Sequence, residues 1–279
     1  MNSMKISFLE PHLQIYGGIR RILELANRLG ERGHNVTIFH SDGSACKWMK
    51  CIAKVKPSDQ ILNEGHDVII YNDPNPNDYK FAQKVEARLK VFYVLDLLYD
   101  NSLLTGLKLK LYDPWYKRPL YLKKSLRSPY LKLANATWVK EWLKKNMKLD
   151  SVLLLGGVNR EMFYPVEVEK NINEIRILCS GDPRDRKGTK TVLDAFEIVK
   201  KEEPNVLLDT YHGKRIPQDR MSEKYCSADI FVDAQWYAGW NNPVAEAMAC
   251  KVPVVCTNIG GVADFAFHEK TALLVPPKD

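Results

Sequence analysis

Residues 229–257, DIFVDAQWYAGWNNPVAEAMACKVPVVCT, decide the fold. The apolar runs at 229–234 and 252–257 have the length of buried strands, and residues 243–250 between them, PVAEAMAC, are typical of a helix. A strand, a helix and a second strand in succession form a unit of a parallel sheet. Because ligands bind beyond the carboxyl ends of such strands, the loop at 235–242 is a candidate site.

The same alternation runs through the rest of the chain. Strand-like runs occur at 5–9, 35–39, 67–71, 90–95, 151–155, 175–180 and 205–211, and helical patterns at 17–29, about 81–89 and 189–201. The series restarts after a basic region and a loop at 156–166. The predicted fold is therefore α/β, with two Rossmann-like domains at 1–162 and 163–279.

The composition of the 279 residues is that of a globular protein, with 45% hydrophobic and 27% charged residues. No apolar run approaches the roughly 20 residues that span a bilayer, and the first residues lack the apolar region of a signal peptide. We therefore expect a cytoplasmic protein. The six cysteines show neither disulfide nor metal-ligand spacing, so no metal site is expected, and Cys179, Cys250 and Cys256 are candidate core residues.

Basic and aromatic residues concentrate at 108–148. Twelve Lys and Arg residues stand there against Asp113 and Glu141, with Trp and Tyr interleaved. This mixture suits an anionic membrane surface, because ammonium groups seek lipid phosphate and aromatic rings settle at the interface. It also suits a nucleic acid or a protein partner, or a solvated helical face with its rings turned inward. We expect peripheral contact with an anionic membrane, at the inner membrane face, and no nucleic acid.

Two loops that follow strands have the character of anion sites. In YGGIRR (16–21), Gly17 and Gly18 open a helix and allow close approach of backbone amides, although a plain structural turn fits equally well. In SGDPRDRKGTK (180–190), Arg184, Arg186 and Lys187 crowd one turn, with Lys190 beyond them. Such side chains can neutralise a diphosphate, or they form a solvated charge cluster.

The third loop is that of the opening stretch. Asn242 and Pro243 fit the cap and first turn of a helix, because proline lacks an amide hydrogen that would be unpaired there. The amides of Val244 and Ala245 would then point out of the helix toward an anion. Glu246 follows one turn later. A carboxylate in an apolar helix needs a partner, which a pair of ligand hydroxyls or a structural arginine would supply.

These loops, in this order, resemble the retaining glycosyltransferases of group 1 (family 4). The resemblance lies in YGGIRRILELANRLGERGHNVTIF, GGVNREMFYP, RKGTKTVLDAF and the stretch from residue 229 to the TALLVPP segment. It implies the GT-B fold, in which two Rossmann-like domains face each other across a cleft. It also implies a nucleoside-diphosphate sugar as donor, bound mostly by the C-terminal domain, with no cofactor and no metal ion.

The resemblance also assigns roles. Lys187, with Arg184 or Arg186, would hold the donor diphosphate and act in catalysis, and the Gly17–Gly18 turn would face the same group. Glu246 is the second glutamate of the E-x7-E motif and would hold the ribose. Further contacts to the sugar or phosphate would come from Gly239 in the glycine loop and from the helix start, Asn242, Pro243 and Val244.

Several departures accompany the resemblance. The first glutamate of E-x7-E is replaced by Ala238, and an arginine of the basic loop by Asp182. A histidine that many members carry after the fourth strand falls on Leu95, which leaves Asp96 as the nearest polar group for catalysis. The chain also ends at LLVPPKD, where family members continue into further helices, so a truncated, partial or reduced C-terminus is expected.

The function expected is that of an enzyme. It would move a hexose from the donor to a glycan or lipid-linked acceptor with retention of configuration. A non-catalytic GT-B protein that binds a nucleotide sugar or a partner enzyme is the alternative, and another GT-B enzyme such as a sugar-nucleotide epimerase is a third. The lost glutamate positions sugar hydroxyls and does not neutralise charge, so its absence should alter sugar choice more than departure of the diphosphate.

Overall fold

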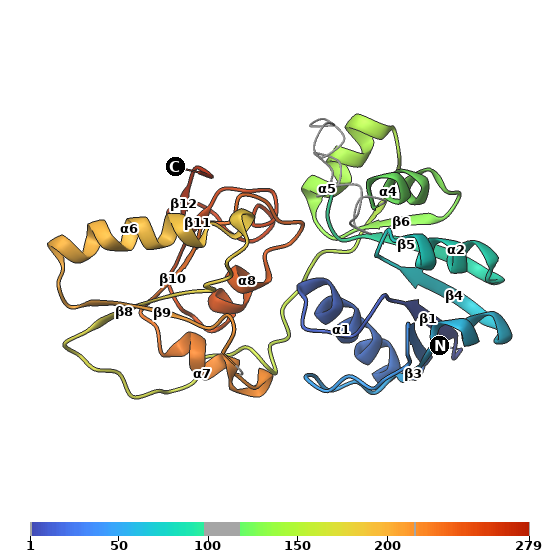
Figure 1. Cartoon of the computed structure of the whole chain (residues 1–279), viewed down its shortest axis with the longest axis horizontal. Coiled ribbons are helices and arrows are strands. Elements are labelled where there is room, and N and C mark those ends of the chain that lie inside the picture. The colour runs from blue at the N-terminus through green and yellow to red at the C-terminus, as the bar shows by residue number, and fades with distance from the viewer. Residues whose placement is uncertain (1, 98–117, 215, 279) are drawn as a thin grey trace. The chain divides into compact units, whose positions relative to one another are not determined.

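The computed structural model describes residues 2–97, 118–214 and 216–278. They form two compact units (Figure 1), one of Met1–Asn135 with Val139–Leu155 and the other of Ala136–Trp138 with Gly156–Asp279. Each unit is built on a parallel sheet, which confirms the α/β class. The predicted domain limits at 162 and 163 stay a prediction, and residues 108–117 of the basic region lie outside the described residues.

The first unit contains a seven-stranded sheet in the order β3-β2-β1-β4-β5-β6-β7. Its strands are β1 (Lys5–Leu9), β2 (Asn35–His40), β3 (Lys54–Pro57), β4 (His66–Tyr71), β5 (Ala87–Val94), β6 (Leu131–Ala134) and β7 (Val152–Leu153). Its helices are α1 (Gly17–Glu31), η1 (Ser58–Asn63), α2 (Pro76–Lys84), α4 (Arg118–Arg127), α5 (Thr137–Trp142), which runs into the other unit at residues 137–138, and the short π-helix η3 (Leu143–Met147).

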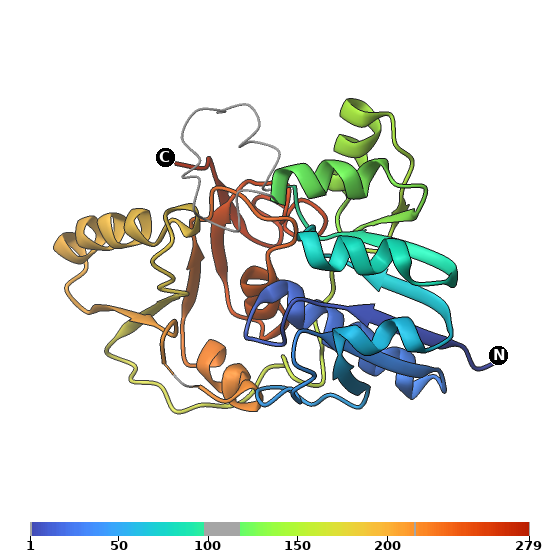
Figure 2. The ribbon, with the colours of Figure 1, turned by 45° about the vertical axis from the view of Figure 1, so that its right-hand side comes forward.

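Helices cover both faces of this sheet. The apolar stripe of α1, which includes Ile19 and Ile22, packs against Phe8 of β1 and Ile38 of β2. Figures 1 and 2 show α2 and α4 together on the other face. Burial on both faces explains why the central strands read as continuous apolar runs.

The helix expected at about 81–89 is wrong in position. Helix α2 starts earlier, at Pro76, because the Asn75 side chain accepts hydrogen bonds from the amides of Asn77 and Asp78 at 2.9 Å and caps it. Residues 87–89 belong instead to β5, which pairs with β4. The sequence pattern also missed β3 and β6, which are four residues long and carry lysines.

The second unit contains a five-stranded sheet in the order β12-β11-β10-β8-β9. Its strands are β8 (Ile175–Cys179), β9 (Val206–Thr210), β10 (Ile230–Asp233), β11 (Val254–Thr257) and β12 (Leu273–Val275). Its helices are α6 (Thr189–Glu202), α7 (Met221–Cys226) and α8 (Asn242–Ala249), with 3-10 turns η4 (Asp185–Lys187) and η5 (Gln218–Arg220).

Two apolar clusters hold this sheet. On one face Val192 of α6 packs with Cys179 and Ala234. On the other face α7 and α8 pack through Tyr225 and Val244 against Phe231 and other strand residues. Figure 2 shows α6 and α7 on opposite sides of the strands. The three cysteines predicted in the core, Cys179, Cys250 and Cys256, are buried.

Candidate functional site

Two loops meet at the carboxyl edge of the second sheet. One follows β8 and contains η4; the other follows β10 and leads into α8. The amide of Trp236 donates to the carbonyl of Arg186 at 2.9 Å. Gly188 has φ of +65°, and a Cβ on it would lie 1.9 Å from the carbonyl oxygen of Ala234. Only glycine allows this approach, so the basic loop and the loop at 234–241 form one structure.

Lys187 faces the second of these loops. Its Nζ donates to Oε1 of Gln235 at 2.7 Å, and the residue is partly buried. Burial, together with the neighbouring Arg186, lowers the pKa of Lys187 from its usual 10.5 to about 8. A buried ammonium beside a second cation is stabilised when an anion arrives, as at a phosphate site.

The other basic residues of the loop differ from one another. Arg184 forms an ion pair with Asp182, with Nε 3.0 Å from Oδ1 and 3.1 Å from Oδ2. Burial opposes ionisation of Asp182, but the hydrogen bonds from Arg184 hold its pKa at about 2. The residue that replaces the expected arginine therefore binds Arg184. Lys190 points away: its exposed ammonium pairs with Asp194 on α6.

The first turn of α8 lies next to this loop, one residue from where the sequence predicted it. The helix begins at Asn242, and Asn241 precedes it without a side-chain cap because that side chain bonds to Asp233 and Gln235. Pro243 lies in the first turn, as expected. The amide of Ala245 donates to the Asn241 carbonyl at 3.2 Å, so the expectation that it points out of the helix is wrong.

Glu246 is buried inside the second unit. Its Oε2 accepts a hydrogen bond from the hydroxyl of Tyr225, on α7, at 2.8 Å. One protein partner of Glu246 is therefore a tyrosine, where the sequence suggested a pair of ligand hydroxyls or a structural arginine. Burial raises the pKa of Tyr225 well above its usual value, so this hydroxyl stays a donor.

Ala238 lies in a tightly packed part of the loop. Ala238 is buried, and a Cβ placed on Gly261 would lie 2.9 Å from the Cβ of Ala238. Trp138 closes the same region, because its indole Nε1 donates to the carbonyl of Gly239 at 2.9 Å and its ring packs over Gly260. The backbone next to Ala238 is therefore held by contacts with Trp138.

The remaining predicted residues lie in the first unit. Gly17 and Gly18 begin α1, as predicted, and a Cβ on Gly18 would lie 3.2 Å from the Leu95 side chain. Asp96 follows Leu95 directly and is half-buried. The structure therefore brings these three residues to the carboxyl edge of the first sheet, and Arg184, Arg186, Lys187, Gly239, Asn242, Pro243, Val244 and Glu246 to the second unit.

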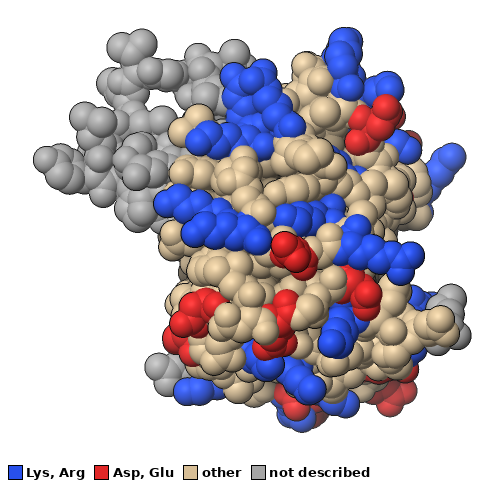
Figure 3. All heavy atoms as spheres, turned by 90° about the vertical axis from the view of Figure 1, so that its right-hand side faces the viewer, with Lys and Arg blue, Asp and Glu red and all other residues tan. Residues whose placement is uncertain are grey.

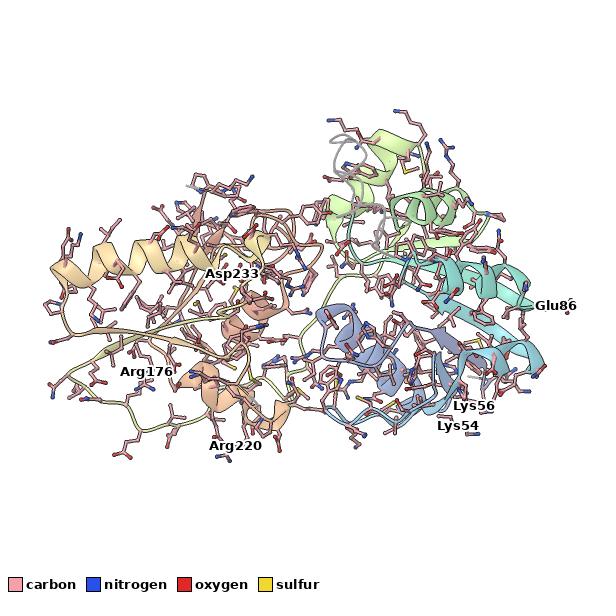
Figure 4. The ribbon with its side chains drawn as sticks, viewed as in Figure 1. Lys54, Lys56, Glu86, Arg176, Arg220 and Asp233 are labelled. Atoms are coloured by element: carbon pink, nitrogen blue, oxygen red, sulfur yellow. The ribbon has the colours of Figure 1, made fainter. Side chains whose placement is uncertain are left out.

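Several polar residues at these edges were not predicted from the sequence. Asp233, Gln235 and Asn241 are buried beneath Lys187, and Figure 4 labels Asp233 at the end of β10. Glu10, directly after β1, is fully buried; burial raises its pKa well above the usual value, and its Oε2 has no hydrogen-bond partner among the described residues. A polar residue that ends a buried strand was the available signal.

Comparisons with known proteins bear on the family and on the fold. Residues 209–279 match the family model described as Glycosyl transferases group 1. The whole chain has the fold of solved glycosyltransferase structures, which confirms the predicted GT-B class of two Rossmann-like domains. The comparisons therefore show a likeness of residues 209–279 to group 1 glycosyltransferases and a GT-B fold for the whole chain.

Particular relatives can be named. The putative teichuronic acid biosynthesis glycosyltransferase TuaC of Bacillus subtilis is 26% identical over 188 residues, which cover 59% of this chain and 48% of TuaC. The structure of sucrose-phosphate synthase from Thermosynechococcus elongatus is similar with a TM-score of 0.72 and 17% identity. The match covers 99% of this chain and 86% of the synthase chain. The structure of Anabaena HepE in complex with UDP-glucose is similar with a TM-score of 0.67 and 14% identity. That match covers 99% of this chain and 86% of the HepE chain. The chain spans about half the length of TuaC.

Within residues 2–97, 118–214 and 216–278, no three His, Cys, Asp or Glu side chains lie close enough together to hold a metal ion. In the same residues, none of the helices combines the length and apolar character that crossing a membrane requires.

Proposed function

We propose that this protein is a glycosyltransferase. It transfers a sugar from a nucleoside-diphosphate sugar to a glycan or lipid-linked acceptor, with retention of configuration. The observation that carries the proposal is the partly buried Lys187, in a loop that also holds Arg184 and Arg186 and contacts the loop leading into α8. HepE, which has the same fold, was solved with UDP-glucose.

In this proposal the cations and the helix start act on the leaving diphosphate. Negative charge builds on the diphosphate as the bond to the sugar breaks, and preorganised positive groups stabilise the transition state most where that charge develops. Lys187 supplies the compact charge of an ammonium, and Arg186 supplies a guanidinium that can bind two phosphate oxygens at once. The first amides of α8, including that of Val244, add the positive end of the helix. No cofactor or metal ion is required.

The remaining residues take narrower roles. Glu246, oriented by Tyr225, holds the ribose hydroxyls, and Gly239 lets the backbone approach the ligand. In the first unit, Gly17 and Gly18 begin α1, where backbone amides can approach an anionic ligand, and Asp96 lies at the same edge of the sheet. Since Ala238 offers no carboxylate, the choice of sugar rests on other contacts of the loop.

A panel of UDP-, GDP- and dTDP-sugars tests this function. With a membrane or glycan extract as acceptor, we expect transfer or slow hydrolysis of one of these donors, unaffected by EDTA. Anomeric configuration is then read by NMR of the product. Nucleotide binding without turnover of any donor would contradict the enzyme and favour a non-catalytic binding protein.

We also propose that the first unit contacts an anionic membrane through α4. A pocket of 490 Å³ lies between α2 and α4, lined by Tyr79, Gln83, Leu120, Lys123, Lys124, Arg127, Ser128, Pro129 and Tyr130. Beneath it Lys132 is 5% exposed and bonds to the carbonyls of Ser128 and Tyr130; burial lowers its pKa to about 8. In Figure 3, basic side chains gather with few acidic ones on the upper part of the face drawn.

The proposed membrane contact predicts that charge on α4 controls binding to anionic vesicles. Changing Lys123, Lys124 and Arg127 to alanine should weaken binding to phosphatidylglycerol vesicles by about 100-fold or more, since each basic residue near such a surface contributes about 1 kcal/mol. Co-sedimentation at two salt concentrations measures this. Neither the wild-type protein nor this variant should bind phosphatidylcholine vesicles.

A second triple variant is the matched control. Lys140, Lys144 and Lys145 lie on α5 and η3, are exposed, and remove the same charge when changed to alanine. We expect this variant to bind more tightly than the α4 variant. Equal losses in the two variants would mean that total charge, and not the pocket, governs binding.

A further inference from the structure

Three polar side chains are buried behind Lys187. Asp233 is 4% exposed, Gln235 2% and Asn241 1%. Asp233 ends β10, Gln235 follows it by two residues, and Asn241 immediately precedes α8. Burial of three polar side chains in one place is unfavourable unless their hydrogen bonds are made, so their pairing decides what the cluster does.

The hydrogen bonds of the cluster converge on the carboxylate of Asp233. The carboxylate of Asp233 accepts from Gln235 Nε2 at 2.9 Å, from Asn241 Nδ2 at 2.9 Å and from the Gln235 amide at 3.2 Å. Gln235 Nε2 also donates to Asn241 Oδ1 at 3.0 Å. Because the amino group of Gln235 is used toward Asp233 and Asn241, its carbonyl oxygen faces Lys187.

The cluster therefore links a carboxylate to an ammonium through one amide. Asp233 also acts on Lys187 through space, because its negative charge opposes the lowering of the Lys187 pKa that burial and Arg186 cause. The backbone of Gln235 is held as well, since the hydroxyl of Thr257 at the end of β11 donates to its carbonyl. Gln235 thus has little freedom to turn away from Lys187.

We propose that Gln235, backed by Asp233 and Asn241, is a positioning residue that orients the Lys187 ammonium toward the donor diphosphate. The inference rests on the proposed function and deepens it. The buried carboxylate of Asp233 fixes the orientation of the Gln235 amide, and that amide fixes the ammonium. Neither Asp233 nor Gln235 needs to touch the donor.

Titration of Lys187 tests the contact without any ligand. The protein is labelled by reductive ¹³C-methylation and followed by NMR across the pH range, with Lys187→Met to assign the signal. In Gln235→Met the ammonium loses its acceptor, and in Asp233→Asn the Gln235 amide is free to turn its amino group toward Lys187. Both variants should lower the Lys187 midpoint by about one pH unit. Lys190 is the internal control and should not move.

Gln235→Glu separates positioning from a merely structural role. It keeps the shape of the side chain but places a carboxylate against Lys187, so the Lys187 midpoint should rise. It also serves if Gln235→Met does not fold. An unchanged Lys187 midpoint in the folded variants would overturn the contact, because loss of packing alone shifts stability and not this titration.

Binding of inorganic diphosphate, UDP, GDP and dTDP, measured by calorimetry at pH 7, completes the test. Gln235→Met should weaken binding of the ligand that the wild-type protein binds by about tenfold, the effect of losing one hydrogen bond to a charged group. Gln235→Glu should weaken binding too, because its carboxylate competes with the diphosphate for the Lys187 ammonium. A shifted titration with unchanged affinity would overturn the inference alone. Failure of the wild-type protein to bind any of these probes would overturn the proposed function as well.

Discussion

Replacing Lys187 with methionine should lower the rate of sugar transfer by about 10²- to 10³-fold, the usual cost of removing one preorganised group that stabilises charge in a transition state. Methionine keeps the length of the side chain but removes the charge that meets the leaving diphosphate. The measurement is kcat and KM with the donor that the wild-type protein uses. Because the charge acts most strongly as the bond breaks, kcat should fall more than KM rises.

Lys190→Met is the matched control. Lys190 belongs to the same basic stretch, but its exposed ammonium pairs with Asp194, so its loss should leave transfer within about twofold of wild type, as for most surface changes. A Lys187→Met protein that retains the wild-type rate would contradict the assignment of Lys187 to the diphosphate.

The pKa of Lys187 adds a pH signature. Since that pKa lies at about 8, donor binding and transfer should decline as the pH rises through 8, and Lys187→Met should not show this decline. Stability should change in the opposite direction. The unfolded lysine, with its usual pKa of 10.5, binds more protons than the folded one between about pH 8 and 10.5, so the contribution of this group to stability rises with pH there.

Gly188→Ala should destabilise the second unit by about 2 to 5 kcal/mol. About 1 to 2 kcal/mol comes from forcing a residue with a Cβ to φ of +65°. A further 1 to 3 kcal/mol or so comes from the overlap of that Cβ with the Ala234 carbonyl, which the loop must move to relieve. Urea unfolding followed by the fluorescence of Trp236 and Trp240 measures the loss. Donor binding should fall too, because the two loops of the site separate.

Gly213→Ala is the control for this prediction. Gly213 belongs to the same unit and has φ of +74°, but nothing lies within 4 Å of a Cβ placed on it. It should show the conformational cost alone, about 1 to 2 kcal/mol. Equal losses for the two variants would mean that the approach of Gly188 to Ala234 does not hold the loops together.

The predictable parts of the fold are those with strong local patterns. The apolar runs of β1, β4 and β10 and the amphipathic helices α1 and α6 lie where periodicity placed them. The helix expected at 81–89 failed because Asn75 and Pro76 start α2 earlier, and because β5 begins with polar residues that gain strand structure only by pairing with β4. Cap chemistry was readable in the sequence, whereas pairing with a neighbouring strand was not.

In the candidate site, too, features of neighbouring residues were predictable and pairs distant in the sequence were not. Local sequence selected the basic loop and the proline of α8, because these are properties of neighbouring residues, and the family resemblance singled out Ala238. The partners were not selected. Tyr225 lies 21 residues from Glu246 and Gln235 lies 48 residues from Lys187. Such pairs depend on the order of strands in the sheet, which brings the loops after β8 and β10 to one edge.

Sequence alone was therefore enough for the α/β class, the two Rossmann-like domains and the group of residues at the second unit's sheet edge. Folding was needed to separate Lys187, which burial and Gln235 make a distinct cation, from Arg184, which Asp182 binds, and from Lys190, which remains in solvent. The physical reason is that residue type sets charge and reach, but the pKa and direction of a side chain depend on its burial and its partners. These are supplied by segments distant in the chain.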